Sequence, residues 1–311
     1  MLLEGKVAVV TGSGAGLGRA YALALAKAGA KVVVNARTAN DVAQVVAEIE
    51  TAGGTAERCI SSVASMEGGR QTIQTAIDKF GRIDILVNNA GITRPKLLTE
   101  MTEQDFDDVI ATNLKGTFAC TKHAVPYMIE QKWGRIINVA SGAVRGVVPQ
   151  TNYAASKGGV LSMSLTWALE LAKYGITCNV IRTHARTRMT ERSIEQARQA
   201  ALERHEQPPT ASDLGIYEPE SAAPLVVFLA SDQACKINGQ FISIDGPRLA
   251  ICAHTRPVVS AISPGGWTVE HLLEDFKTTV GTQLESPGNF QKIFDGVASI
   301  TRQATRTTEG R

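Results

Sequence analysis

Thr11-Gly-Ser-Gly-Ala-Gly-Leu-Gly18 follows the apolar run Lys6-Val-Ala-Val-Val10 and precedes an alanine-rich stretch. The run predicts a short buried strand and the stretch predicts a helix, so the glycines lie at a strand-to-helix turn. Glycine lets the backbone turn tightly, and the start of a helix offers free N–H groups to a phosphate. We therefore expect a pyrophosphate-binding turn formed by Gly12, Ser13, Gly16, Leu17 and Gly18.

Short apolar runs alternate with helical stretches over the first 250 residues. Strands are expected at Val7–Val10, Lys31–Asn35, Ala56–Ile60, Ile83–Val87, Arg135–Ala140, Thr177–Ile181 and Gln240–Ile244. Helices are expected at Gly18–Ala28, Asn40–Ala52, Gly69–Phe80, Glu103–Lys132, Tyr153–Lys173 and Pro219–Leu229. Continuous Val/Ile runs are typical of strands that are covered on both faces. The alternation predicts an α/β fold, a doubly wound parallel sheet of the Rossmann type, as a single domain over residues 1–250.

Two regions fall outside this alternation. Residues 187–218 are polar and contain Pro208-Pro209, so they are either a lid over a ligand or an ordinary solvated excursion. Residues 251–311 form a C-terminal extension, with a helix expected near Val269–Phe276 and a frayed polar end.

Composition excludes several classes of protein. A net charge of +2 favours neither a nucleic-acid partner nor a membrane surface. No apolar run reaches the roughly 18 residues that would span a bilayer, and the N-terminus reads as a strand and not as a leader. The five cysteines lack metal-ligand spacing, so we expect buried thiols, no metal site and a cytoplasmic location.

Tyr153 and Lys157, in Asn152-Tyr-Ala-Ala-Ser-Lys157, are four residues apart and share one face of a helix. An ammonium about 4 Å from the phenol would favour phenolate by roughly 4 kcal/mol, enough to lower its pKa by roughly two to three units from about 10. Tyr153 would then exchange a proton near pH 7. Taken in isolation, the pair is more typical of an exposed helix surface than of a catalytic site.

Several motifs occur in a fixed order: Thr11–Gly18, Asn88-Asn-Ala-Gly91, Asn113, Ser141, Tyr153 and Lys157. In this order they resemble the short-chain dehydrogenase/reductase superfamily, over about residues 5–250. The resemblance implies a fold that binds NAD or NADP and transfers hydride to or from a small-molecule carbonyl or alcohol substrate. It also implies homodimers or homotetramers built through the helices near residues 103–132 and 153–173.

The resemblance also implies roles for individual residues. Tyr153 would be the general acid or base, and Lys157 would hold the nicotinamide ribose. Ser141 would bond the substrate oxygen, and Asn113 would anchor a water that relays protons. The cofactor groove would be lined by Asn89, Ala90 and Gly91. Each of these residues also has a purely structural interpretation as a loop or turn former.

The cofactor preference rests on Val34-Asn35-Ala36-Arg37. An acid at this place would bind the ribose hydroxyl of NAD, but here it is absent and Arg37 can pair with a 2′-phosphate. We therefore expect NADP(H), with NAD(H) as the alternative. Ser62 stands where relatives carry an aspartate before Val63, at the adenine.

The chain departs from the superfamily pattern at other places. Thr183-His184 stands where relatives have a Pro-Gly pair. Thr187 is the candidate for the threonine that contacts the nicotinamide carboxamide in the family. The segment from Ser141 to Tyr153 is one residue shorter than is common in the family. The extension, with Gly265-Gly266-Trp267, is similar to hydroxyacyl-CoA dehydrogenase-like members.

The expected function is a ketone reductase or secondary alcohol dehydrogenase, acting on a 3-oxoacyl thioester, a steroid-like ketone or another bulky ketone. The alternatives are a catalytically weak nucleotide-binding protein, an NAD-linked hydroxyacyl-CoA dehydrogenase, and a lyase or epimerase that uses nicotinamide transiently. Five basic residues are expected near the entrance to the substrate site: Arg94, Lys96, Arg145, Arg186 and Arg188. They either bind phosphates of the substrate or are ordinary solvated surface charges.

Overall fold

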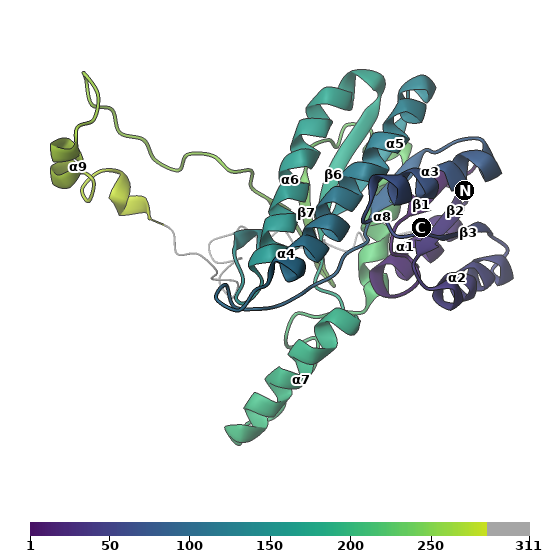
Figure 1. Ribbon diagram of the computed structural model, residues 1–311, viewed down its shortest axis with the longest axis horizontal. Coiled ribbons are helices and arrows are strands. Elements are labelled where there is room, and N and C mark those ends of the chain that lie inside the picture. Colours follow the sequence, from purple (N-terminus) through teal and green to yellow (C-terminus); the bar gives the residue numbers. More distant parts are fainter. Residues whose placement is uncertain (285–311) are drawn as a thin grey trace, which may run out of the picture. The chain divides into compact units, whose positions relative to one another are not determined.

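The computed structural model describes residues 1–284, which divide into two units, one ending at Arg256 and the other beginning at Pro257. The first unit holds one eight-stranded sheet in the order β3-β2-β1-β4-β5-β6-β7-β8. Figure 1 shows this sheet together with the helices that flank it. Its strands are β1 Val7–Val10, β2 Lys31–Ala36, β3 Thr55–Ile60, β4 Ile85–Asn88, β5 Gly134–Val139, β6 Ile176–Arg182, β7 Phe241–Asp245 and β8 Arg248–Cys252. Seven strands are parallel and β8 is antiparallel to β7, which confirms the doubly wound α/β fold.

Helices cover both faces of this sheet. The helices of this unit are α1 Gly16–Lys27, α2 Ala39–Thr51, α3 Met66–Phe80, α4 Glu103–Val109, α5 Gly116–Gln131, α6 Thr151–Leu171, α7 Arg188–Glu203 and α8 Ala223–Leu229. Apolar residues of α1, α2 and α8 pack with one set of alternating strand residues, and those of α3, α5 and α6 pack with the other. Two buried cores therefore lie on opposite sides of the sheet.

Chain order determines where the site lies. The strands proceed outward from β1 to β3, and the chain then returns to place β4 beside β1. Parallel sheets bind ligands at the carboxyl ends of the strands where this order reverses. The glycine-rich turn follows β1 and the Asn88–Gly91 motif follows β4, so both lie at that point.

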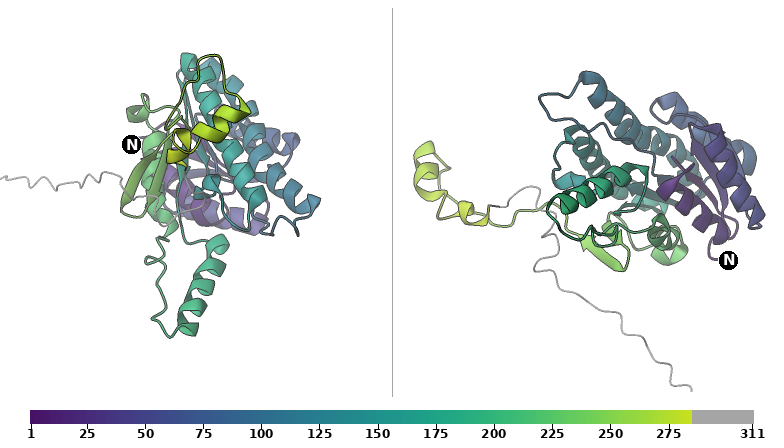
Figure 2. Two further views of the ribbon diagram at one scale, coloured as in Figure 1. Left: turned by 90° about the vertical axis from the view of Figure 1, so that its left-hand side faces the viewer. Right: turned by 90° about the horizontal axis from the view of Figure 1, so that it is seen from below.

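Three elements differ from the sequence-based expectation. The helix expected over 103–132 is interrupted by a π-helix at Ile110–Lys115, between α4 and α5. The polar segment 187–218 contains α7, which is amphipathic enough to bury Ile194 and Ala201 and which extends away from the sheet (Figure 2). The third strand is a largely exposed edge and not a doubly covered one.

Two smaller expectations are also corrected. Strand β8 was missed because its residues Leu249 and Ile251 are exposed at the sheet edge, so it lacks the pattern of a buried strand. Cys235 is exposed, whereas Cys59, Cys120 and Cys178 are buried as expected.

The second unit, as far as it is described, contains α9 at Val269–Asp275, which confirms the helix predicted there. The predicted frayed end lies outside the described residues. Within residues 1–284 no helix is long and apolar enough to cross a membrane, and no three His, Cys, Asp or Glu side chains are grouped as metal ligands.

Candidate active site

The glycine-rich turn has the backbone that its sequence predicts. Gly12 and Gly16 have φ of 63° and 54°, in the left-handed region that favours glycine. A Cβ at Gly18 would meet the Gly12 carbonyl oxygen and lie 2.6 Å from Asn89 Nδ2. No side chain caps the N-terminus of α1, and its first turn holds no acidic residue. The turn therefore offers uncompensated N–H groups to an anion, and it fits a pyrophosphate.

Gly18→Ala tests this close packing. The added methyl group has no room, so we expect the substitution to cost roughly 1–3 kcal/mol of unfolding free energy and to weaken dinucleotide binding at least about tenfold. Urea unfolding and NADPH fluorescence titration measure the two effects. Gly158→Ala is the control, because no atom lies within 4 Å of its Cβ position. Equal NADPH affinity in the two variants would refute the role of Gly18.

The Asn88–Gly91 motif holds the glycine-rich turn from the neighbouring strand. The Thr11 hydroxyl accepts hydrogen bonds from the backbone N–H groups of Asn89 and Ala90, both at 3.0 Å. The Asn89 amide donates to the carbonyl oxygens of Thr11 and Gly12, at 2.9 and 3.1 Å. Thr11, which the sequence analysis did not single out, therefore couples the two loops.

The side chains of Ser13 and Leu17 pack inward from the glycine-rich turn, and their contacts with a cofactor remain a prediction. Ser13 is fully buried, and its hydroxyl donates to the Val10 carbonyl oxygen at 2.7 Å. Its backbone N–H donates to the Asn35 carbonyl oxygen, also at 2.7 Å. Both donors of Ser13 are therefore used inside the protein. Leu17 packs against the core formed with α1 and α8.

Asn113 lies fully buried in the π-helix between α4 and α5. Its amide donates to the Ile92 carbonyl oxygen and to Ser156 Oγ, both at 3.1 Å, and its Oδ1 accepts from the Ile92 N–H at 2.8 Å. Ser156 Oγ in turn donates to the Tyr153 carbonyl oxygen at 2.8 Å. Ser156 is a second residue that the sequence analysis missed, and it ties Asn113 to α6. π-Helical turns of this kind are frequent at functional sites.

Lys157 is buried on α6, and its ammonium donates to the Val139 carbonyl oxygen at 2.6 Å. The nitrogen lies 5.8 Å from the centre of the Tyr153 ring. The position of Gly91 is close to both Lys157 Nζ and Asn113 Oδ1, at 3.7 and 3.4 Å from a Cβ built there. Burial lowers the pKa of Lys157 to about 8.

The Tyr153 phenol lies beside Ser141, which follows β5. Ser141 Oγ accepts from the Ala143 N–H at 3.2 Å. Burial raises the pKa of Tyr153, and Ser141 opposes that rise only in part. The net shift in this structure is therefore opposite to the lowering predicted for the Tyr153–Lys157 pair. The Lys157 ammonium donates to the Val139 carbonyl oxygen, and loss of solvation is the largest influence on the phenol.

The predicted adenosine-binding residues lie at the ends of β2 and β3. Arg37 directly follows β2, is exposed, and has no ion-pair partner within residues 1–284. Ser62 is exposed and accepts a 3.4 Å hydrogen bond from the Ala64 N–H, whereas Val63 is buried in the core. One acid was missed: Asp41 Cβ lies 2.8 Å from a Cβ built at Gly14, beside the glycine-rich turn.

Thr187, in the segment that follows β6, lies beside the same turn. It caps α7, and its Cγ2 lies 3.2 Å from a Cβ built at Gly16. The structure thus brings Thr187 to the glycine-rich turn, and it places Ser141, Tyr153, Lys157 and Asn113 together.

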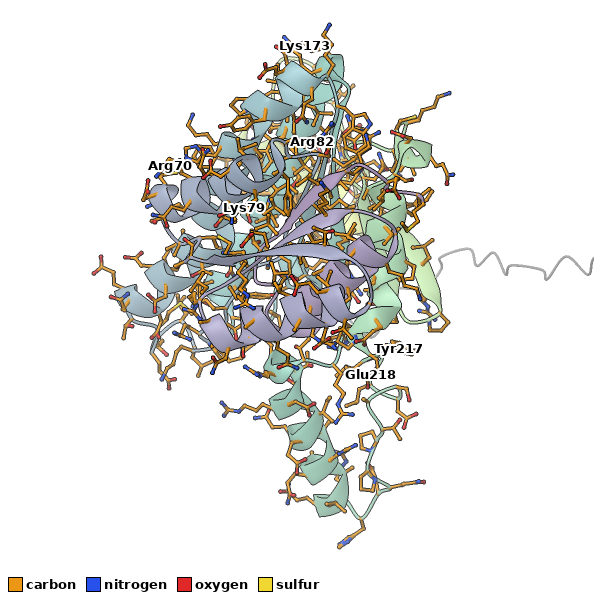
Figure 3. All side chains as sticks on the ribbon, turned by 90° about the vertical axis from the view of Figure 1, so that its right-hand side faces the viewer. Arg70, Lys79, Arg82, Lys173, Tyr217 and Glu218 are labelled. Atoms are coloured by element: carbon orange, nitrogen blue, oxygen red, sulfur yellow. The ribbon has the colours of Figure 1, made fainter. Side chains whose placement is uncertain are left out.

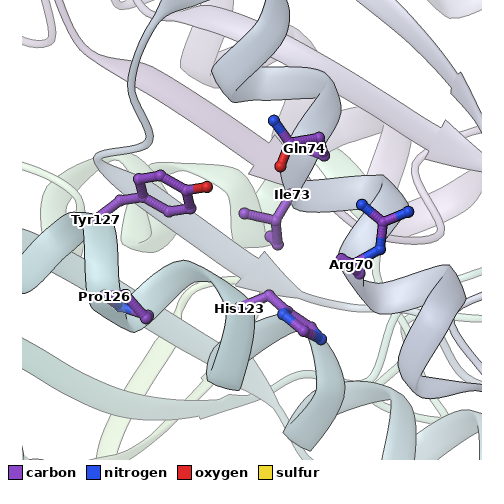
Figure 4. Close-up of a pocket in the computed structure, with 6 residues that line it drawn as sticks. All are labelled: Arg70, Ile73, Gln74, His123, Pro126 and Tyr127. Carbon is purple, nitrogen blue, oxygen red and sulfur yellow. The ribbon is translucent and has the colours of Figure 1, made fainter.

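A surface cavity of about 250 Å³ lies elsewhere, between α3 and α5 (Figure 4). None of the predicted site residues lines it. Its lining residues are Arg70, Ile73, Gln74, His123, Pro126 and Tyr127.

Comparisons with known proteins agree with this geometry. The family model described as short chain dehydrogenase matches residues 6–198. The chain is 43% identical over 249 residues to the 3-oxoacyl-[acyl-carrier-protein] reductase FabG of Thermotoga maritima, covering 79% of this chain and 98% of that protein. It is 36% identical over 311 residues to the peroxisomal multifunctional enzyme type 2 of Drosophila melanogaster, covering 96% of this chain and 45% of that protein.

A comparison with solved structures also points to the short chain dehydrogenases. The crystal structure of a short chain dehydrogenase from Mycobacterium avium superposes with a TM-score of 0.78 at 34% identity, covering 93% of this chain and 98% of that one. This protein is therefore a member of the short-chain dehydrogenase/reductase family, an NAD(P)-binding oxidoreductase that acts on CH–OH groups.

Proposed function

We propose that the protein is an NADP(H)-dependent reductase that interconverts a ketone and a secondary alcohol. The observation that carries the proposal is the placement of Ser141 beside the Tyr153 phenol, with the Lys157 ammonium 5.8 Å from the centre of the phenol ring. Two hydroxyl groups that converge on one point can bond a carbonyl oxygen, and the oxygen then needs a proton. The geometry fits this need better than it fits a binding protein without turnover.

The chain's own residues have distinct tasks in this proposal. Ser141 orients the substrate oxygen, and Tyr153 delivers the proton to it in reduction or removes it in oxidation. Lys157, charged below about pH 8, favours the phenolate that remains. Asn113 and Ser156 fix the loop at Ile92 relative to helix α6 through their hydrogen bonds. When bound, the dinucleotide supplies the hydride.

The glycine-rich turn, Thr187 and Arg37 would hold the dinucleotide. The uncapped start of α1 fits its pyrophosphate. The Arg37 guanidinium directly follows β2, has no ion-pair partner in the described part of the chain, and fits a 2′-phosphate. Asn89, Ala90 and Gly91 would line the groove between the phosphate turn and Lys157. Ser62 and Val63 would lie near the adenine.

Arg37→Ala is expected to lower the ratio of NADPH to NADH efficiency by roughly ten- to hundredfold, because a charge-assisted hydrogen bond contributes about 1.5–3 kcal/mol. The measurement is kcat/KM with each dinucleotide. Asp41→Asn should change the ratio in the opposite direction, because Asp41 lies beside the same turn and its negative charge repels a phosphate. An unchanged ratio in Arg37→Ala would make NAD(H) the better assignment.

The substrate class that we favour is a 3-oxoacyl thioester. Two observations support it: several relatives are 3-oxoacyl-[acyl-carrier-protein] reductases, and Lys96, Arg145 and Arg188 are exposed without ion-pair partners in the described part of the chain. An NAD-linked hydroxyacyl-CoA dehydrogenase is the second candidate, because the Drosophila relative matches the extension as well as the family domain.

A substrate panel tests both candidates. NADPH or NADH is supplied with acyl thioesters, steroids, diketones and aromatic ketones, and absorbance at 340 nm is followed. We expect turnover with NADPH and a thioester, and a KM for that thioester that rises with salt. Turnover only with small uncharged ketones, with no effect of salt, would remove the thioester assignment.

We also infer a homodimer or homotetramer, with a cytoplasmic location as the expected setting. Leu169 on α6 is 84% exposed and Phe118 on α5 is 41% exposed. Exposed apolar side chains on these two helices support their use as a subunit contact.

A further inference from the structure

The turn between β6 and α7 connects the end of the sheet to the glycine-rich turn. It comprises residues 183–187 and ends at Thr187, whose methyl group touches the position of Gly16. It contains neither proline nor glycine, so its own sequence does not fix its backbone. Something else must hold Thr187 in place.

A single carboxylate holds one side of this turn. Asp245 Oδ1 accepts the His184 N–H at 2.8 Å. Asp245 Oδ2 accepts Arg182 Nη2 and the Ser243 hydroxyl, both at 2.8 Å. The Arg182 and Asp245 side chains are each 12% exposed, and they end β6 and β7 at the carboxyl edge of the sheet. The charges are therefore nearly buried and compensate each other.

Tyr217 holds the other side. Its N–H donates to the His184 carbonyl oxygen at 3.1 Å, and its carbonyl oxygen accepts the Arg186 N–H at 2.7 Å. Its ring fills the space beside Gly246, the residue that follows Asp245 and has φ of 57°. Figure 3 shows Tyr217 at the base of the α7 excursion.

We propose that Arg182, Asp245 and Tyr217 form a clamp that positions the turn before Thr187 and thereby sets the affinity of the enzyme for its dinucleotide. These are positioning residues: they act through the backbone of His184 and Arg186. The inference rests on the proposed function in one respect, namely that a dinucleotide lies against Gly16 and Thr187.

The chain contains a matched control for this clamp. Asp84 precedes β4 at the amino edge of the sheet, away from the crevice, and its side chain is fully buried. Its Oδ2 accepts the Val7 N–H at 2.9 Å and Arg82 Nε at 2.8 Å, and its Oδ1 accepts Arg82 Nη2 at 2.7 Å. Arg82 and Tyr217 lie well apart in Figure 3. A carboxylate with the same kinds of partner therefore exists where no dinucleotide binds.

The experiment compares Asp245→Ala and Asp245→Asn with Asp84→Ala in the full chain. The dissociation constant for NADPH is measured by fluorescence, and the midpoint of urea unfolding is measured on the same samples. We expect Asp245→Ala to raise the dissociation constant roughly ten- to hundredfold. Asp245→Asn keeps an oxygen for the His184 N–H and should have a smaller effect. Asp84→Ala should lower the urea midpoint and leave the dissociation constant within about threefold of wild type.

Each outcome has a distinct meaning. Equal dissociation constants in Asp245→Ala and Asp84→Ala would overturn the clamp while leaving the proposed function intact. A wild-type chain that binds neither NADPH nor NADH would overturn the proposed function, and the clamp with it. If Asp245→Ala does not fold, Asp245→Asn and Arg182→Gln give the same comparison: an NADPH affinity equal to that of Asp84→Asn would refute the clamp.

Discussion

Tyr153→Phe is expected to lower kcat by a factor of about 10²–10⁴ and to leave the dissociation constant for NADPH within about threefold. The substitution removes the hydroxyl that donates the proton and keeps the aromatic ring. Ser141 is then the only hydroxyl that faces the carbonyl oxygen, and it has no neighbouring group from which to regain a proton that it donates. The measurement is steady-state turnover of the best ketone found in the panel, together with NADPH fluorescence titration.

Tyr127→Phe is the matched control for this variant, because Tyr127 lines the separate cavity between α3 and α5. It should retain wild-type turnover. If Tyr153→Phe retained turnover close to that of Tyr127→Phe, another group would have to supply the proton, and the proposed role of Tyr153 would be wrong.

Lys157→Met is expected to reduce kcat at least about a hundredfold and to raise stability at pH 7. The reason is that burying the charged ammonium destabilises the folded protein, and methionine carries no charge. The folded-state pKa of Lys157 is about 8, against an ordinary value of 10.5. This pKa difference corresponds to about 3 kcal/mol of unfolding free energy that the methionine variant would gain. The lost hydrogen bond to Val139 removes about 1 kcal/mol of that gain.

The sign of the pH dependence follows from the same values. Below about pH 8 the lysine is protonated in both the folded and the unfolded chain, so the cost of burying its charge is fully present. Between about 8 and 10.5 the folded chain has released the proton and the unfolded chain still binds it, so the cost fades as pH rises. Urea unfolding should show Lys157→Met more stable than wild type by about 2 kcal/mol at pH 7, with a smaller advantage at pH 9.5. A methionine variant that is less stable at both pH values would contradict this account.

The sequence was sufficient to predict the seven parallel strands because they depend on local patterns, and the candidate site residues were proposed from local motifs as well. Each strand-helix unit is specified within about thirty residues, and the order of the strands follows from right-handed crossovers. The turn at Gly12–Gly18 needs glycine for its own backbone. Tyr153 and Lys157 share a face because they are four residues apart on one helix.

What could not be predicted depends on contacts between distant residues. Asp245 meets His184 across 61 positions, and no spacing rule connects them. Ser13 lies in the right motif, yet its hydroxyl turns inward to Val10 because β1 and β2 are paired there. The pKa of Tyr153 depends on the burial of the phenol and on the direction of the Lys157 ammonium, neither of which can be read from their separation in the chain.

The most direct test is an ultraviolet difference titration of the Tyr153 phenol, taken as wild type minus Tyr153→Phe, with and without NADP⁺. In the free protein we expect a pKa above the ordinary value of about 10, because burial raises it. With saturating NADP⁺ we expect a pKa below about 10, because the charge of Lys157 and that of the oxidised ring then both favour phenolate. A pKa that stays above about 10 with the dinucleotide bound would contradict the claim that Tyr153 is the proton-transferring group.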